Sequence, residues 1–294
     1  MDQVQDGVRR ITAPNGGPMT YTGTQTYLVG SGDVALIDPG PNMADHRAAI
    51  MAALQPGERI SHILVTHAHL DHTPLARVMA DELGVAAYGF GDAHAGRSDA
   101  MIALAHAGAP LGGGEGVDAQ FAPDEILADG DVLDGGDWSL QAWHTPGHMA
   151  NHLCFIWRDA AAGFSGDHVM EWATTLVSPP DGDLTAFMSS LRGMQGRSDG
   201  LVLYPGHGKP VLNAEGRIAD LILHREGRER QILDALHAGP AQIVTLTAAI
   251  YTDINPALMP AAARNVFAHL VDLYGRGLVI CDGLPGADVD WARA

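Results

Sequence analysis

The chain has 294 residues, of which 46% are hydrophobic and 18% are charged, and its formal net charge at pH 7 is −18. That length and apolar fraction exclude intrinsic disorder and are enough for one large domain, alone or with a small appended one. An acidic surface repels polyanions on average, so the charge argues against general binding to nucleic acid or to an anionic membrane.

The sequence also lacks the usual signs of export. The first six residues have neither a basic start nor an apolar core, so they predict no signal peptide. The longest uncharged stretch, residues 11–32, contains prolines and glycines that exclude a membrane helix. Cys154 and Cys281 lie far apart and exclude a disulfide framework. We therefore expect a soluble, cytoplasmic protein.

Residues 25–90 predict alternating strands and helices. Short apolar runs between Gly- and Pro-containing turns predict strands, and apolar residues at helical spacing predict helices. The expected order is strands at 25–29 and 34–37, a helix at 44–54, a strand at 60–66, a helix at 74–83 and a strand at 85–90. This order is typical of an α/β domain.

The rest of the chain divides into a glycine-rich segment, a strand-rich segment and a helical tail. Residues 91–116 have little periodicity, which predicts a long loop or a lid over a site. The later elements are expected as strands at 139–144, 153–157, 163–165 and 201–204, a helix at 184–194, helices at 215–238, 245–251 and 260–274, and a strand at 278–281. We predict two domains, residues 1–214 and residues 215–294.

The densest group of chemistry-bearing residues directly follows the strand predicted at 60–66. His67, His69, Asp71 and His72 have the spacing His-x-His-x-Asp-His. Residues two apart in extended backbone project to the same side, so His67 and His69 can share one metal ion. Asp71 and His72 lie on the turn that begins the next helix and face a neighbouring position. Imidazole nitrogens and a carboxylate suit Zn²⁺, with iron and manganese as alternatives.

Three further motifs, HTPGH at 144–148, SGDH at 165–168 and PGHG at 205–208, also end predicted strands. A structural zinc is closed by four ligands, often cysteines, and none of these motifs contains cysteine. Seven ligands fit two ions with open positions, which is a catalytic arrangement. The candidate ligands are His67, His69, Asp71, His72, His148, Asp167 and His207.

In order and spacing these motifs resemble the metallo-β-lactamase superfamily, over residues 20–212. Asp38, in a DPG motif, matches the first motif of that superfamily, whose aspartate usually supports the His-rich loop from behind. Residues 23–30, residues 179–183 and the C-terminal helical region resemble more closely the lactamase-β-2-like branch, whose members carry a winged-helix-like C-terminal domain.

The resemblance implies an αββα sandwich with a dinuclear metal site at one edge and a small C-terminal helical domain. It implies that Asp167 bridges the two ions. The other implied ligands are His67, His69 and His148 for one ion, and Asp71, His72 and His207 for the other.

The remaining polar and aromatic candidates have other expected roles. His144 precedes Thr-Pro and is expected to pack or to orient its loop. His168 adjoins Asp167 and is a candidate for substrate binding or proton transfer, although strand alternation also allows it to point away. Packing or surface positions are expected for His94, His106, His152, Trp172 and Tyr204.

These residues predict a metal-dependent hydrolase. Two bridged ions supply a metal-bound hydroxide at neutral pH, which Asp71 can orient by hydrogen bonding. We expect a small ester, thioester, lactone or amide as substrate and Asp71, Asp167 and His168 as the catalytic candidates. The sequence does not determine the oligomeric state, and a homo-oligomer is compatible with it.

Two other functions have to be weighed. Some lactamase-β-2-like proteins cut single-stranded RNA, but residues 1–216 hold 10 basic and 26 acidic residues, unlike a basic RNA channel. A winged-helix tail could instead make the chain a DNA-binding regulator. The helix predicted at 260–274, however, offers only Arg264, so we expect the tail to cover the active-site mouth or a partner subunit.

Overall fold

The computed structural model describes residues 1–108, 111 and 116–294, and two β-sheets form its centre. One sheet, in spatial order, consists of β1 (Asp2–Gln5), β2 (Val8–Thr12), β3 (Gln25–Val29), β4 (Asp33–Ile37), β5 (Arg59–Leu64), β6 (Ala87–Gly89) and β7 (Glu125–Ile126). The other consists of β12 (Val202–Pro205), β11 (Ala162–Gly166), β10 (Leu153–Trp157), β9 (Ser139–His144) and β8 (Val132–Asp134).

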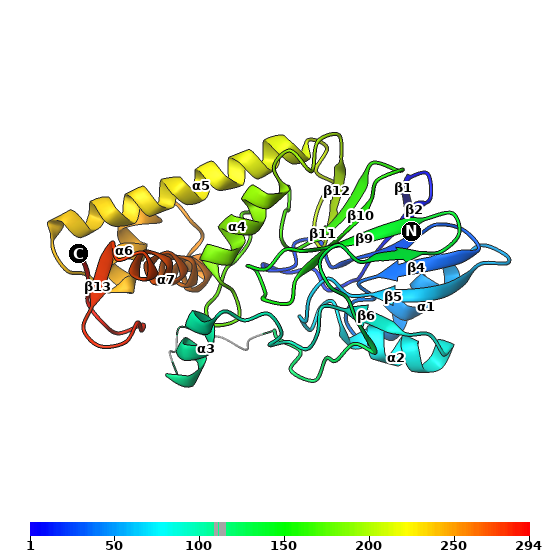
Figure 1. The fold of residues 1–294 in the computed structure, drawn as a ribbon, viewed down its shortest axis with the longest axis horizontal. Helices are drawn as coiled ribbons and strands as arrows, with labels where there is room; N and C mark the ends of the chain where they lie inside the picture. Colours follow the sequence, from blue (N-terminus) through cyan, green and yellow to red (C-terminus); the bar gives the residue numbers. More distant parts are fainter. Residues whose placement is uncertain (109–110, 112–115) are drawn as a thin grey trace.

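Helices cover the outer faces of both sheets and form the C-terminal end of the molecule (Figure 1). They are α1 (Ala44–Ala52), α2 (Pro74–Leu83), α3 (Asp99–His106), α4 (Leu184–Met194), α5 (Ala214–Ala235), α6 (Ile243–Ile250) and α7 (Met259–Gly275), with 3₁₀ turns η1 (Leu236–Ala238) and η2 (Pro256–Leu258). A hairpin of β13 (Val279–Cys281) and β14 (Trp291–Arg293) packs beside α7. The described helices include none that is both long and apolar enough to span a membrane.

The core has layers that match an αββα sandwich. Tyr27, Leu64, Phe155 and Phe164 belong to a buried cluster between the two sheets. One outer cluster joins the first sheet to α1 and α2, and another joins the second sheet to α4 and α5. The α/β fold class predicted from the sequence is confirmed.

Strand directions bring several loops to one edge of the sandwich. The first sheet is parallel from β4 to β7, and β11 runs parallel to β12. Since β10 is antiparallel to both β9 and β11, the carboxyl ends of β9, β11 and β12 share an edge. At that edge Leu153 N–H donates to Thr66 O over 2.7 Å, and Gln25 N–H donates to Gly206 O over 2.7 Å, which joins the two sheets.

Several elements differ from the expectation, because the sequence analysis named no strand at β1, β2, β7, β8 or β14. The segment 91–116, expected as a loop or lid, contains α3, whose N-terminus is capped because the Ser98 side chain accepts from Met101 N–H over 3.3 Å. A serine N-cap is a strong local helix signal that the glycine-rich surroundings obscured. The three consecutive glycines themselves lie outside the described residues.

The boundary between residues 214 and 215 stays a prediction. It falls at the beginning of α5, which starts at Ala214. Ile218 and Leu221 of α5 share a buried cluster with Phe187 of α4 and Trp143 of β9, so the first half of α5 packs on the sandwich. Ile232, near the other end of α5, packs with α6 and α7.

We expect Leu221→Ala to lower the free energy of unfolding by about 2–5 kcal/mol, because it leaves a cavity in the α4–α5 contact. Leu221 is fully buried, whereas Leu223 on the same helix is 62% exposed. Leu223→Ala is therefore the matched control and is expected to stay within about 0.5 kcal/mol of the wild type. Urea unfolding of both variants measures the difference, and equal losses would contradict the packing role of α5.

Candidate metal centre

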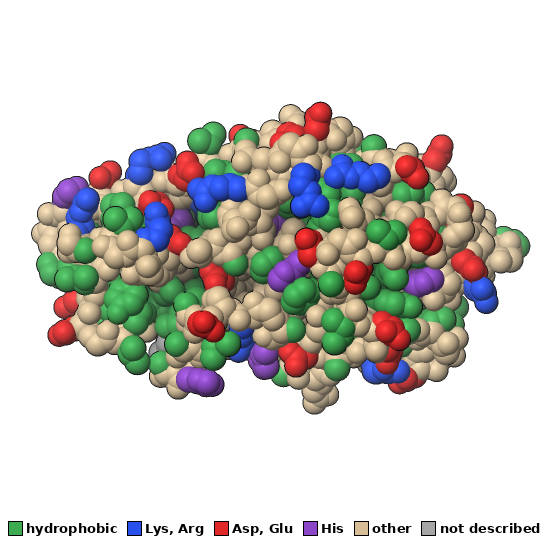
Figure 2. Space-filling model, viewed as in Figure 1, with side chains coloured by type: hydrophobic (Ala, Val, Ile, Leu, Met, Phe, Trp, Pro, Cys, Tyr) green, Lys and Arg blue, Asp and Glu red, His purple; other side chains and the backbone are tan. Residues whose placement is uncertain are grey.

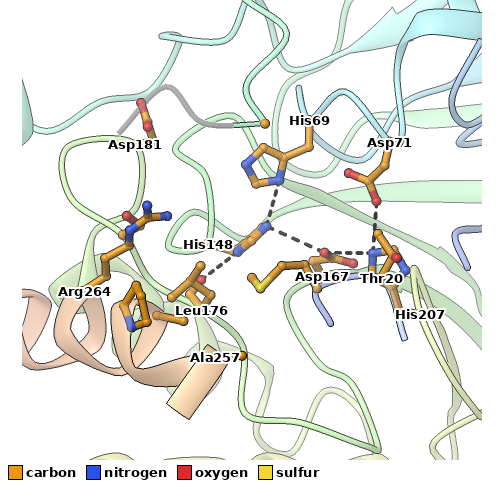
Figure 3. Close-up of a pocket in the computed structure, with 15 residues that line it drawn as sticks. Thr20, His69, Asp71, His148, Asp167, Leu176, Asp181, His207, Ala257 and Arg264 are labelled. Carbon is orange, nitrogen blue, oxygen red and sulfur yellow. Dashed lines mark hydrogen bonds and ion pairs between the residues drawn. The ribbon is translucent and has the colours of Figure 1, made fainter. Parts of the chain in front are cut away.

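All seven predicted ligands cluster at the sandwich edge, in the loops that follow β5, β9, β11 and β12. Five of them line one pocket (Figure 3), namely His69, Asp71, His148, Asp167 and His207. The ligands form three groups, and within each group the candidate ligand atoms lie no more than 4.8 Å from one another. The groups are His67, His69 and His148; His67, His72 and Asp167; and Asp71, His72 and His207.

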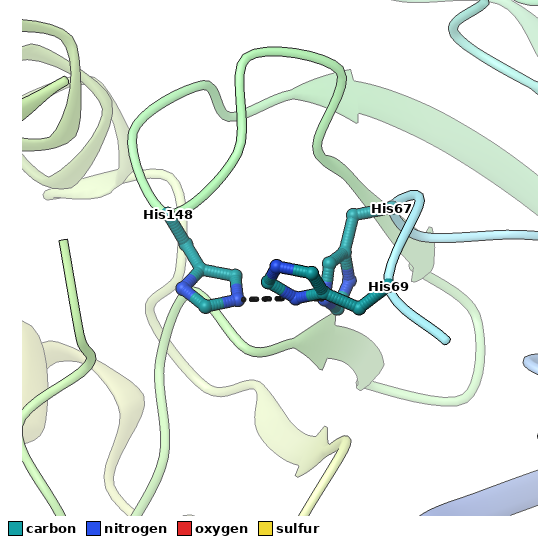
Figure 4. Close-up of side chains that lie close together, drawn as sticks. All are labelled: His67, His69 and His148. Carbon is teal, nitrogen blue, oxygen red and sulfur yellow. Dashed lines mark hydrogen bonds between the residues drawn. The ribbon is translucent and has the colours of Figure 1, made fainter. Parts of the chain in front are cut away.

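The first group consists of three imidazoles whose nitrogens converge (Figure 4). His69 Nδ1 lies 2.8 Å from His67 Nε2 and 3.0 Å from His148 Nε2. Burial in this crowded position lowers the pKa of His69 to about 3, so the ring is neutral and able to act as a ligand.

The third group, Asp71, His72 and His207, combines a carboxylate with two imidazoles. Asp71 Oδ2 lies 3.2 Å from His207 Nε2 and 3.3 Å from His72 Nε2. Asp167 lies between the groups, with Oδ2 3.4 Å from His207 Nε2 and 3.7 Å from His148 Nε2. This is the position that a bridging carboxylate would need.

Hydrogen bonds on the far side of four rings determine which nitrogen faces the pocket. His72 Nδ1 donates to Asp38 Oδ2 over 2.9 Å, and His148 Nδ1 donates to Leu176 O over 2.7 Å. His207 Nδ1 donates to Gly23 O over 3.2 Å. When such a ring is in its neutral, metal-binding form, Nδ1 carries the proton and Nε2 turns a lone pair toward the pocket.

The fourth ring, His67, is oriented through Asp38. Thr66 donates twice to that carboxylate, from N–H to Oδ1 over 2.8 Å and from Oγ1 to Oδ2 over 2.7 Å. Because the Thr66 hydroxyl proton is donated to Asp38, Thr66 Oγ1 acts as the acceptor for His67 Nδ1 over 2.9 Å. Asp38, which the family resemblance implied as a support of the His-rich loop, therefore holds both His67 and His72.

The site fits cations. His72 Nε2 and Asp167 Oδ1 are buried and have no hydrogen-bond partner among the described residues. Burial disfavours the charged form of His207, but the Asp167 and Asp71 carboxylates outweigh it and raise the pKa of His207 to about 10. Converging lone pairs, orphaned buried atoms and carboxylates that attract positive charge are what a divalent metal satisfies.

Comparisons with known proteins support the same assignment. The sequence model of the metallo-beta-lactamase superfamily matches residues 19–207, and that of the beta-lactamase associated winged helix domain matches residues 243–291. The chain belongs to the metallo-β-lactamase superfamily. The family and the hydrolase class predicted from the motifs are thus confirmed at the level of the family.

Two curated relatives carry thioesterase names. The chain is 32% identical to thioesterase pkgB of Emericella nidulans, covering 81% of this chain and 63% of the relative. It is 32% identical to the atrochrysone carboxyl ACP thioesterase of Aspergillus fumigatus, covering 80% and 67%. The chain thus spans about two thirds of the length of these relatives.

A solved structure shows the same fold. The beta-lactamase domain protein from Burkholderia ambifaria superposes with a TM-score of 0.81 at 22% identity, covering 100% of this chain and 93% of that one. The metallo-β-lactamase fold with its C-terminal domain is therefore shared along the whole chain.

The C-terminal part of this member of the metallo-β-lactamase superfamily also holds one of the loops of the candidate metal centre. Arg225 on α5 is buried and donates to Thr175 O and, over 3.0 Å, to Asn265 Oδ1 on α7. Asn265 Oδ1 also accepts from Val177 N–H over 3.2 Å. Leu176, between Thr175 and Val177, supplies the carbonyl that orients His148, so α5 and α7 stabilise this ligand.

Other candidates lie around the pocket rather than in it. His144 stacks on Phe90, with ring centroids 3.7 Å apart, as expected for a packing residue. The His168 ring is buried against Phe187, with ring centroids 4.7 Å apart, and it does not line the pocket. The catalytic role of His168 therefore stays a prediction that the geometry does not support. His94 and His106 are exposed.

His152 and Trp172 do more than the packing expected of them. His152 Nε2 accepts from Asp167 N–H over 3.2 Å, and its ring stacks on His67 at 5.1 Å. Thr24, which the sequence did not single out, donates from Oγ1 to Asp71 Oδ2 over 2.9 Å. Trp172 lines an extension of the pocket, whereas Tyr204 packs between the sheets as expected.

Gly206, beside His207, shows why a glycine accompanies the ligands. A Cβ there would lie 2.4 Å from Asp167 Oδ1 and 2.7 Å from His72 Cε1. A side chain at this position would displace two of the candidate ligands, so only glycine allows the backbone to approach so closely.

Asp38→Asn is expected to weaken metal binding by about 10–100-fold, the usual cost of losing a group that orients a ligand. The amide keeps the shape, but it replaces one of the two oxygens that together accept three hydrogen bonds with an NH₂ group, which can only donate. Competition with a chromophoric chelator measures the affinity. The matched control is Asp33→Asn, because Asp33 is partly exposed and pairs with Arg59 on the surface. Equal affinities of the two variants would contradict the role of Asp38.

Proposed function

We propose that this chain is a metal-dependent hydrolase of small acyl substrates, with acyl thioesters the favoured class. The observation that carries the proposal is the convergence of five imidazoles and two carboxylates, of which three imidazoles and both carboxylates line a pocket open to solvent. The thioester is favoured over an ester, lactone or amide because two relatives of similar sequence are named thioesterases.

Each ligand has a proposed place. His67, His69 and His148 would hold one ion, and Asp71, His72 and His207 would hold the other, with Asp167 between them. Zn²⁺ is the proposed ion because neutral imidazole and carboxylate suit it, and iron or manganese would suit the same set. Bound there, the ions would supply a hydroxide nucleophile at neutral pH and polarise the acyl carbonyl.

The chain's own carboxylates position the nucleophile. The Asp71 side chain is 26% exposed, compared with 10% for Asp167, so Asp71 is the acid more accessible to a water in the pocket. Thr24 fixes Asp71 through a hydrogen bond to Oδ2. Asp71 can thus accept a hydrogen bond from the attacking water while Asp167 stays buried between the ion sites.

The pocket suits a small acyl compound better than a nucleic acid. Its cavity of about 390 Å³ is lined by both parts of the chain, and Arg264 of α7 lies opposite Asp71 and His207 (Figure 3). Among the described lining residues Arg264 is the only arginine or lysine, beside Asp71, Asp167 and Asp181.

The surface arginines and the C-terminal helices support the same choice. Over α5 the arginines are interspersed with acidic side chains (Figure 2), and Arg192 pairs with Glu226. Since α7 and η2 line the pocket, we propose that the C-terminal domain shapes the active site rather than reading DNA.

We expect about two equivalents of metal per chain, and His207→Ala should retain about one, because it removes a ligand of the second site only. Elemental analysis after dialysis measures the content. His94→Ala changes an exposed histidine outside the site and should keep both ions. A wild-type content that never rises above one on titration would contradict the dinuclear site.

Asp167→Ala should lower thioester turnover by more than about 100-fold, the upper cost of losing a group that merely supports a ligand. The assay is thiol release from acyl thioesters, run beside esters, lactones, amides and labelled single-stranded RNA. Circular dichroism should show that the fold survives. Cleavage of RNA alone, lost in Asp167→Ala, would establish the endoribonuclease instead. Acyl turnover that survives both the substitution and chelation would exclude metal-dependent hydrolysis.

A further inference from the structure

The metal centre opens into a second chamber that the reaction as described does not use. This chamber has a volume of about 370 Å³ and shares Met19, His148, Asp167, Leu176 and Ala261 with the main pocket. The two chambers are therefore halves of one cavity, and the proposed ion sites lie where they meet. The volume is within the range of small-molecule sites, about 300–1,000 Å³.

The halves differ in chemistry. The main pocket contains Ser178, Asp181 and Arg264 besides the ligands. Beyond the shared His148 and Asp167, the described lining of the second chamber has no charged side chain and consists mainly of apolar and aromatic groups. These include Met170, Trp172, Tyr251, Ile254, Leu258 and Ala262.

The walls of the chamber are held in place before any ligand arrives. Trp172 stacks on Tyr21, with centroids 4.8 Å apart and planes at 13°. The guanidinium of Arg228 lies 4.1 Å from the Tyr251 ring centroid. Rigid aromatic walls lower the entropic cost of binding, so the chamber is shaped to receive an apolar group.

We propose that this chamber binds the acyl group of the substrate, which must then be an apolar aliphatic or aromatic acyl chain. This inference rests on the proposed function. The acyl carbon lies at the junction of the two halves, so that the acyl chain extends along Trp172 and Leu258. The thiol part extends into the polar half past Ser178 and Arg264.

The reaction balances as a hydrolysis. Water oxygen forms a bond to the acyl carbon, the carbon–sulfur bond breaks, and sulfur leaves as a thiol that takes up one proton. The product in the apolar chamber is a carboxylic acid, which ionises and leaves. No oxidation or reduction takes place.

The test is a series of N-acetylcysteamine thioesters from acetyl to decanoyl. In the wild type kcat/KM should rise about four-fold for each added methylene until the chamber is full, the value that corresponds to burying one CH₂. Leu258→Asp places a charge in the chamber, and the octanoyl-to-acetyl ratio of kcat/KM should fall at least about 10-fold. General damage to the fold would lower both substrates equally and leave the ratio in place.

Leu212→Asp is the matched control, because Leu212 is 78% exposed and lies outside both chambers. It should keep the wild-type ratio. The acyl chamber would be overturned if kcat/KM of the wild type did not depend on chain length, or if Leu258→Asp left the octanoyl-to-acetyl ratio unchanged. Neither result would contradict thioester hydrolysis itself.

A second measurement separates the chamber from the proposed function. The ligands are S-octyl- and S-ethyl-N-acetylcysteamine, thioethers that cannot be hydrolysed. Wild-type protein treated with a chelator should bind the S-octyl compound more tightly than the S-ethyl compound, and tryptophan fluorescence can follow the binding. Binding with this preference but without thioester hydrolysis would support the chamber and reject the proposed function. Equal affinity for the two thioethers would reject the chamber.

Discussion

The structure depends on seven candidate ligand groups whose polar atoms crowd around the same positions at the sandwich edge. Hydrogen bonds on the outer side of His67, His72, His148 and His207 hold a proton on each Nδ1, so that in the neutral form of each ring the Nε2 lone pair points inward. Lone pairs at distances such as the 2.8 Å between His67 Nε2 and His69 Nδ1 repel unless a cation or a proton lies between them. The charge of the two carboxylates adds to that demand, and a pair of divalent ions would meet it.

The groups that orient the ligands come from most layers of the fold. Asp38 follows β4, Gly23 and Thr24 precede β3, and Arg225 and Asn265 lie on α5 and α7. The C-terminal helices therefore serve the centre twice, since they line the pocket and hold the loop whose Leu176 carbonyl orients His148. A metal-loaded centre and a folded C-terminal domain should accordingly stabilise each other.

Most of the features that could be predicted, in the fold and in the candidate site, depend on spacing between residues close together in the sequence. The pattern from His67 to His72 lies within one loop, so alternation along the backbone was enough to recognise it. Three more ligands, His148, Asp167 and His207, each stand after a predicted strand, and the family resemblance related them to the same site. The α/β class followed from the order of strands and helices for the same reason: it depends on near neighbours in the sequence.

The contacts that the sequence did not reveal depend on register and on backbone atoms. His152 reaches Asp167 only because β10 pairs with β9 in the register Leu153 to His144 and with β11 on its other side. The carbonyls of Gly23 and Leu176 are present in every residue and give no signal. Trp172 and Leu258 line one chamber although they are far apart in the chain, and only the tertiary fold brings η2 and the loop after β11 to the same cavity.

Anomalous X-ray diffraction from crystals of the metal-loaded protein tests the central claim most directly, because it locates the ions themselves. The account predicts two peaks in each chain. One should lie within bonding distance of His67, His69 and His148, the other within bonding distance of Asp71, His72 and His207, and Asp167 should contact both. A single peak, or peaks bound to other residues, would contradict it.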